Sequence, residues 1–193
     1  ARFRAMVGLP ADHESTALLS GERQVAPALE GIQQDHLERY RWAAAQSTGT
    51  VLDIGAGIGY GSAILADAPG VGLVVSYERS AESIAYAKAH YDRKTIDRQS
   101  VDLDGYHFRG QPIAEFATAF EIIEHLANPY PMLESLPAKR LFASVPNQDV
   151  IPYSPETAPF HQRHYTRDQF QALLNATGWQ VEGWYGQQGR DSP

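Results

Sequence analysis

Glycines crowd residues 55–61, directly after the short apolar run of residues 50–54. At a strand-to-helix turn, glycines let the backbone approach a ligand where a Cβ would clash, and the helix N-terminus offers unpaired N–H donors. Glu78 stands at the predicted end of the next strand, where a carboxylate can accept hydrogen bonds from both hydroxyls of a ribose. The pattern predicts a nucleoside-binding site.

The residues around the glycines discriminate among nucleoside ligands. Tyr60 stands where a dinucleotide fingerprint requires a small residue, and no Gly-Lys-Ser/Thr follows, as a phosphate loop would need. Asp53, inside the preceding strand, brings a negative charge that suits the amino group and sulfonium of S-adenosylmethionine (SAM) better than a pyrophosphate. The alternative is that the glycines only form a tight turn and that Glu78 is solvated. We therefore favour SAM as the cofactor over a nicotinamide.

A second group of reactive side chains follows the predicted fourth strand. Glu121, Glu124 and His125 are spaced as neighbours on one helical turn, which would bring them toward one region. Methyl transfer from a sulfonium is an in-line displacement, so positioning dominates and a base is needed only for a protonated acceptor. The catalytic candidates are Glu124 and His125, with His125 as proton acceptor and His161 as its less favoured substitute. The alternative for His125 is a structural histidine bonded to backbone carbonyls.

The spacing of apolar runs predicts how these residues are positioned. Strands are expected over residues 50–54, 72–77, 95–101, 116–120, 139–145 and 178–186, and helices over residues 35–46, 60–68, 81–91, 128–136 and 167–176. This alternation is typical of an α/β, Rossmann-like doubly wound sheet with ligands at the carboxyl ends of its strands. Residues 1–30, interrupted by glycine and proline, are interpreted as an N-terminal arm or lid, and residues 31–193 as the SAM-binding methyltransferase domain.

Composition excludes several other classes. A chain of 193 residues, 43% hydrophobic, can bury one ordinary core, and the absence of cysteine excludes a disulfide scaffold and a cysteine nucleophile. That absence suits a reducing compartment, so we expect a cytoplasmic protein. The net charge of −7 disfavours nucleic acid as a partner. No apolar run reaches the roughly 18 residues of a membrane span, so no membrane association is expected. A homodimer is compatible with the sequence.

Several segments together resemble a known family, the class I SAM-dependent methyltransferases, and notably a bacterial branch often found beside sugar-modifying genes. The resemblance implies a SAM-dependent enzyme that methylates oxygen or nitrogen of a small-molecule or glycan-like acceptor. It covers nearly the whole chain. The segments that carry it are residues 36–40, 51–61, 78, 120–126, 144–147 and 159–166.

The resemblance also implies roles for individual residues. Residues 55–57 would contact the methionine part of SAM, Glu78 the ribose, Asp102 and Leu103 the adenine, and Glu121 would lie beside the methyl group. The complete implied cofactor-binding set is Asp53, Gly55, Ala56, Gly57, Glu78, Arg79, Asp102, Leu103 and Glu121. Two segments depart from the family pattern: Ala117 replaces an aspartate, and residues 137–140 replace a Pro-Gly-Gly turn. Because the predicted strands stop at the sixth, either the seventh, antiparallel strand of the family is missing or the sequence is truncated.

Two further interpretations remain open. Glu121, Glu124, His125 and His161 resemble the ligands of small-RNA 2′-O-methyltransferases, in which a divalent metal would acidify a ribose hydroxyl. The same Glu-x-x-Glu-His run occurs in relatives without metal dependence, so we expect no resident metal. The other interpretation is a catalytically silent SAM-fold subunit that pairs with a partner through an exposed sheet edge. Chelation distinguishes the metal-assisted enzyme from the other two.

Overall fold

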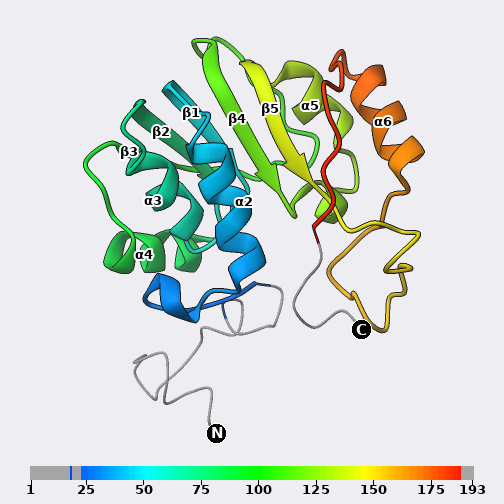
Figure 1. Ribbon diagram of the computed structural model, residues 1–193, viewed down its shortest axis with the longest axis horizontal. Coiled ribbons are helices and arrows are strands. Elements are labelled where there is room, and N and C mark those ends of the chain that lie inside the picture. The colour runs from blue at the N-terminus through cyan, green and yellow to red at the C-terminus, as the bar shows by residue number, and fades with distance from the viewer. Residues whose placement is uncertain (1–17, 19–22, 188–193) are drawn as a thin grey trace, which may run out of the picture.

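The computed structural model describes Leu18 and residues 23–187, and Figure 1 shows their arrangement. A parallel sheet of five strands forms the centre of this part of the chain, in the order β3-β2-β1-β4-β5. Its strands are β1 (Gly49–Ile54), β2 (Val71–Glu78), β3 (Ile96–Ser100), β4 (Ala114–Phe120) and β5 (Ala138–Ser144). The order reverses between β1 and β4, and open α/β sheets bind ligands at such a point, beyond the carboxyl ends of the strands.

Helices cover both faces of the sheet. They are η1 (Leu29–Gly31), α2 (Gln34–Ala44), α3 (Tyr60–Ala66), α4 (Ala81–His90), η2 (Ile123–His125), α5 (Tyr130–Ser135) and α6 (Arg167–Ala176). Helices α2 and α3 pack against one face through Tyr40 and Leu65, which belong to the same buried cluster as Val51 of β1. The opposite face packs against α5 and α6 around Leu52, the neighbouring residue of the same strand. Because successive strand residues point to opposite faces, β1 is buried on both sides, as its continuous apolar run predicts.

Local capping signals fix where two of these helices begin. The Ser80 hydroxyl accepts a hydrogen bond from the Ser83 N–H at the start of α4. At the start of α6, Thr166 and Gln169 form a reciprocal capping box. Such caps satisfy N–H groups that lack partners within the helix. Both helix starts are therefore specified by residues that can be recognised in the sequence.

The predicted sixth strand over residues 178–186 is wrong. That segment is extended but belongs to no strand, so β5 is an edge of the sheet in the described part of the chain. Two of its aromatic side chains pack on helices: the indole N–H of Trp179 donates to the carbonyl oxygen of Leu133, at 2.9 Å, and the Tyr185 ring contacts Trp42 of α2. Glu182 contacts β5 through its side chain, which forms an ion pair with Arg140 at 3.2 Å. Glycines within the segment also weaken strand pairing. No seventh strand is found among the described residues either.

Residues 1–17 and 19–22 of the predicted arm lie outside the described residues. The described remainder contacts the domain, because the Tyr91 hydroxyl donates to the carbonyl oxygen of Ala26 at 2.7 Å. Within the described part of the chain, no helix combines the length and the apolar character that crossing a membrane requires.

Candidate active site

The turn between β1 and α3 is closed at one glycine and open at another. Gly55 and Gly57 both have positive φ angles, of 76° and 54°. A Cβ on Gly55 would lie 2.6 Å from the side chain of Ile122, which follows β4, so this position is filled by packing. Around Gly57, no described residue other than its two chain neighbours has an atom within 4 Å of the position that a Cβ would take. The turn therefore presents bare backbone to a ligand at Gly57.

Glu78 joins this turn to the start of α4. Its Oε2 accepts a hydrogen bond from the N–H of Gly57 at 2.9 Å, and its Oε1 accepts one from the N–H of Ser80 at 2.8 Å. Arg23 of the N-terminal segment reaches Oε1 at 3.6 Å. The carboxylate predicted to hold a ribose thus lies directly beside the open glycine, although a ribose contact itself stays a prediction.

Asp53 lies beneath the turn and is completely buried. Its carboxylate accepts hydrogen bonds from the hydroxyls of Tyr40, Ser62 and Thr118, at 3.1, 2.5 and 2.8 Å. Burial raises the pKa of the Asp53 carboxyl, and the three hydroxyl donors oppose that rise. In this conformation Asp53 can act on a ligand only through the field of its charge and through the backbone that it holds.

The other residues predicted to bind the cofactor are at or near the same edge of the sheet. The N–H groups of Gly55 and Ala56 both donate to a single carbonyl oxygen near the end of β2, at 3.0 Å each. Beyond β2 and β3, Arg79 and Asp102 are exposed, whereas Leu103 is buried in the core. The structure thus places these residues around the carboxyl ends of β1, β2 and β3.

Glu121 departs from the predicted helical turn. Its φ of 51° is the one positive value at a non-glycine residue in the described part of the chain, and the helical turn comprises only Ile123–His125. Its Oε1 accepts hydrogen bonds from Arg39 of α2 and from the Ser144 hydroxyl at the end of β5, both at 2.6 Å. The helical spacing is wrong here because these contacts with distant elements fix the backbone of Glu121.

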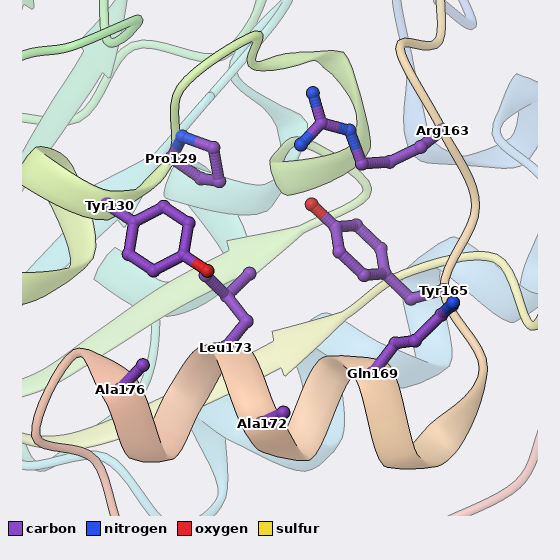
Figure 2. A pocket seen from close by; sticks show the side chains of 8 residues that line it. All are labelled: Pro129, Tyr130, Arg163, Tyr165, Gln169, Ala172, Leu173 and Ala176. Carbon is purple, nitrogen blue, oxygen red and sulfur yellow. The ribbon is translucent and has the colours of Figure 1, made fainter.

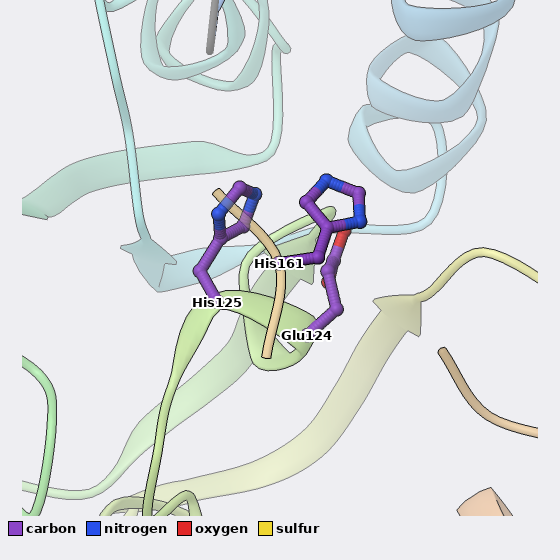
Figure 3. A group of neighbouring side chains, drawn as sticks. All are labelled: Glu124, His125 and His161. Atoms are coloured by element: carbon purple, nitrogen blue, oxygen red, sulfur yellow. The ribbon is translucent and has the colours of Figure 1, made fainter. Parts of the chain in front are cut away.

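Glu124 is a buried carboxylate without a hydrogen-bond partner from any other described residue. Its side chain is completely buried, and both carboxylate oxygens lack such a partner. Burial, followed by the nearby charge of Glu121, raises the pKa of the Glu124 carboxyl well above its usual range. A carboxylate oxygen of Glu124 and one ring nitrogen each of His125 and His161 lie within 4.8 Å of one another (Figure 3). The structure thus brings His161, from a distant loop, next to Glu124 and His125, so the three predicted catalytic residues lie together.

Hydrogen bonds indicate the tautomers of three neighbouring histidines, His125, His161 and His164. His125 Nδ1 lies 3.0 Å from the carbonyl oxygen of Phe160, and His164 Nδ1 lies 2.6 Å from that of Ile151. A carbonyl oxygen can only accept, so both Nδ1 atoms carry the hydrogen. If His164 is neutral, its Nε2 then accepts from His161 Nδ1, 2.7 Å away. In neutral form, His125 and His161 therefore both keep a lone pair on Nε2.

Two positioning residues were missed by sequence reasoning. The ring of His164 lies next to that of His161, and His164 is only 7% exposed. The sequence signal for it was a second histidine three residues after His161. Arg39, which holds Glu121, lies in the predicted first helix, and its charge alone gave no reason to select it. The hydrogen bond from His125 to a backbone carbonyl agrees with the structural alternative for that residue.

A separate pocket of about 380 Å³ lies between α5 and α6 (Figure 2). Arg163 at its rim donates to the carbonyl oxygen of Ala127 at 3.0 Å. None of the lining residues belongs to the glycine turn or to the Glu124 group. They are Pro129, Tyr130, Arg163, Tyr165, Gln169, Ala172, Leu173 and Ala176.

The strand order of the parallel sheet reverses between β1 and β4, and an open glycine turn lies there beside an acid at the end of β2. These features define a nucleoside-binding α/β protein of the class I methyltransferase type. The methyltransferase-domain family model matches residues 28–182, and the chain belongs to this family. The predictions of family, Rossmann-like fold and methyltransferase class are confirmed, and SAM is the methyl donor of that class.

Solved structures show the same fold at low sequence identity. A SAM-dependent methyltransferase from Mesorhizobium loti is 16% identical, with a TM-score of 0.67 over 81% of this chain and 85% of that one. The methyltransferase domain of bacterial CtHen1-C is 20% identical, with a TM-score of 0.60 over 75% and 81%. The N-terminal domain of EvdMO1, solved with S-adenosylhomocysteine (SAH) and D-fucose, is 18% identical, with a TM-score of 0.59 over 78% of each chain. A search of curated protein sequences gives no match.

Proposed function

We propose that this protein transfers the methyl group of SAM to oxygen or nitrogen of a small-molecule or glycan-like acceptor. The observation that carries the proposal is the open backbone at Gly57 beside the carboxylate of Glu78. Backbone without a Cβ leaves room for a nucleoside, and a neighbouring carboxylate can accept from both ribose hydroxyls. This cradle fits the cofactor that the class uses.

Each part of the cradle has a proposed task. Glu78 would hold the ribose, residues 55–57 would lie along the methionine part, and Asp102 and Leu103 would border the adenine. When bound, SAM supplies a sulfonium-activated methyl group. The buried charge of Asp53, beneath the turn, would favour the positive charges of SAM over a pyrophosphate. Arg79, exposed just beyond Glu78, would border the ribose side of the site.

The acceptor is proposed to bind against Glu124, His125 and His161. Glu124 and His125 follow β4, and His161 lies in the loop after β5. Ile122, which also follows β4, packs against Gly55, so the group neighbours the cofactor cradle. The two Nε2 lone pairs and the buried carboxylate form an electron-rich surface that draws the proton from an acceptor hydroxyl or amine. Glu121, held by Arg39 and Ser144, would line the wall between donor and acceptor.

Two observations support a sugar-like acceptor over nucleic acid. EvdMO1, of the same fold, was solved with SAH and D-fucose. The net charge of −7 opposes the approach of a phosphate backbone. The proposal also includes a cytoplasmic location, which suits a chain without cysteine, and a homodimer. We further propose that the N-terminal arm covers the cradle, because Arg23 approaches Glu78 at 3.6 Å.

Calorimetric titration with SAM, SAH and NADH tests the cofactor. We expect binding of SAM and SAH and none of NADH, and binding of NADH alone would overturn the proposal. The acceptor is then sought by transfer of an isotope-labelled methyl group to panels of sugars, small amines and short RNAs. Labelling of sugars or amines supports the proposed acceptor class, labelling of RNA alone contradicts it, and SAM binding without transfer to any panel favours the silent subunit.

A further inference from the structure

We infer that Glu124, His125 and His161 bind a divalent metal ion, which in turn selects an acceptor carrying a hydroxyl beside a second oxygen. This proposal departs from the expectation of no resident metal, and it rests on the proposed function only for the acceptor. It begins from the geometry of the group, in which three possible ligand atoms lie within 4.8 Å of one another (Figure 3).

The carboxylate of Glu124 is the first reason. It is completely buried and neither oxygen has a hydrogen-bond partner among the other described residues, an arrangement that proteins avoid unless something neutralises the charge. Arg39, the nearby cation, is instead directed to Glu121 through a 2.6 Å contact. A proton on Glu124 would also cancel the charge, but a divalent cation could in addition bind the two imidazole rings that share this space with the carboxylate.

The hydrogen bonds behind the histidines are the second reason. Imidazoles that bind metals usually donate their other N–H to a carbonyl or a similar acceptor, which fixes the ring and directs the lone pair. His125 does so toward Phe160, and His161 does so toward His164, which is itself anchored on the carbonyl oxygen of Ile151. The loop that carries His161 is also fastened to Glu124, whose carbonyl oxygen accepts from the N–H of Gln162 at 2.7 Å.

The donor set indicates the kind of ion and acceptor. One carboxylate oxygen and two imidazole nitrogens suit Mn²⁺, Zn²⁺ or Fe²⁺, and three protein ligands leave coordination positions for substrate oxygens. A sugar with adjacent oxygens can fill two such positions, whereas an isolated amine cannot. Beside the cation, the acceptor hydroxyl loses its proton to water more readily. Its oxygen then forms the bond to the methyl carbon as the C–S bond breaks, and the electron pair of that bond stays on sulfur.

Metal binding can be measured without cofactor or acceptor. Chelator-stripped full chain is titrated with MnCl₂ and separately with ZnCl₂ in a calorimeter. We expect one equivalent of at least one ion to bind, and about 100-fold weaker binding or none in Glu124→Gln and His161→Asn. The matched controls Glu134→Gln and His107→Asn replace exposed residues outside the group and should bind as the wild type does. His164 orients His161 without being a ligand itself, so His164→Asn should weaken metal binding by about 10- to 100-fold.

Specific outcomes overturn the inference. The inference is wrong if neither ion binds the wild type, whose folding is checked by circular dichroism. It is also wrong if Glu124→Gln binds the ion as tightly as the wild type does. Because these titrations contain no SAM, their result is independent of the proposed function. SAM binding without metal binding removes the metal site alone, and metal binding without SAM binding removes the methyltransferase alone. Sugar methylation that survives exhaustive chelation contradicts the role of the ion and leaves His125 as the proton acceptor.

Discussion

Replacing Glu78 with glutamine removes the charge at the end of β2 while keeping the size and shape of the side chain. In the proposed complex this carboxylate accepts from two ribose hydroxyls, and a hydrogen bond to a charged group contributes about 1.5–3 kcal/mol. Glutamine keeps one accepting oxygen, so we expect Glu78→Gln to lose about 2–4 kcal/mol of SAH binding. At about 1.4 kcal/mol per tenfold, the dissociation constant rises roughly 30- to 700-fold.

The same substitution also affects the free protein. Glu78 accepts from the N–H groups of Gly57 and Ser80, and the glutamine amide would face one of these donors with a donor of its own. Affinity is measured by calorimetry and stability by urea denaturation, so that a loss of folding is not mistaken for a loss of contact. Glu82→Gln, in the exposed first turn of α4, is the matched control. Unchanged SAH affinity in a folded Glu78→Gln protein would refute the assignment of the ribose site.

Three other perturbations separate binding from stability. Gly57→Ala and Gly105→Ala both place a side chain at a positive φ in open space, so each should lose about 1 kcal/mol of stability, but only Gly57→Ala should weaken SAH binding in a titration. Tyr40→Phe removes one hydroxyl from buried Asp53 and should lower the free energy of unfolding by about 1–3 kcal/mol, and an unchanged urea midpoint would count against that network. Glu124→Gln should raise the melting temperature of the metal-free protein at pH 8 by about 2 °C or more, because it removes an uncompensated buried charge; a lower melting temperature would argue against this.

Local signals explain what the sequence could predict. The apolar run before Gly55 specifies β1, and the glycines that follow require positive φ angles that other residues rarely adopt. Caps at Ser80 and Thr166 specify the starts of α4 and α6. Alternation of these elements then restricts the topology to a parallel, doubly wound sheet. The position of Glu78 beside the turn follows from that topology, because β1 and β2 are neighbours in it.

Contacts between distant segments explain which features the sequence could not predict. The conformation of Glu121 depends on Arg39 and Ser144, which come from α2 and β5, so helical spacing was a poor guide. The segment after α6 resembles a strand in composition, but it contacts helices through its tryptophan and tyrosine side chains and β5 through Glu182, and its backbone joins no strand. The role of His164 depends on a loop geometry that brings its ring against His161. Sequence patterns predict elements better than they predict the side chains that join them.

A crystal structure of the chain with SAH would locate the cofactor. We expect the adenosine at the carboxyl ends of β1 and β2, with the ribose hydroxyls on Glu78 and the amino-acid part of SAH along residues 55–57. Binding of SAH elsewhere, for example in the pocket between α5 and α6, with the open space at Gly57 filled only by protein side chains, would contradict the proposed cofactor site.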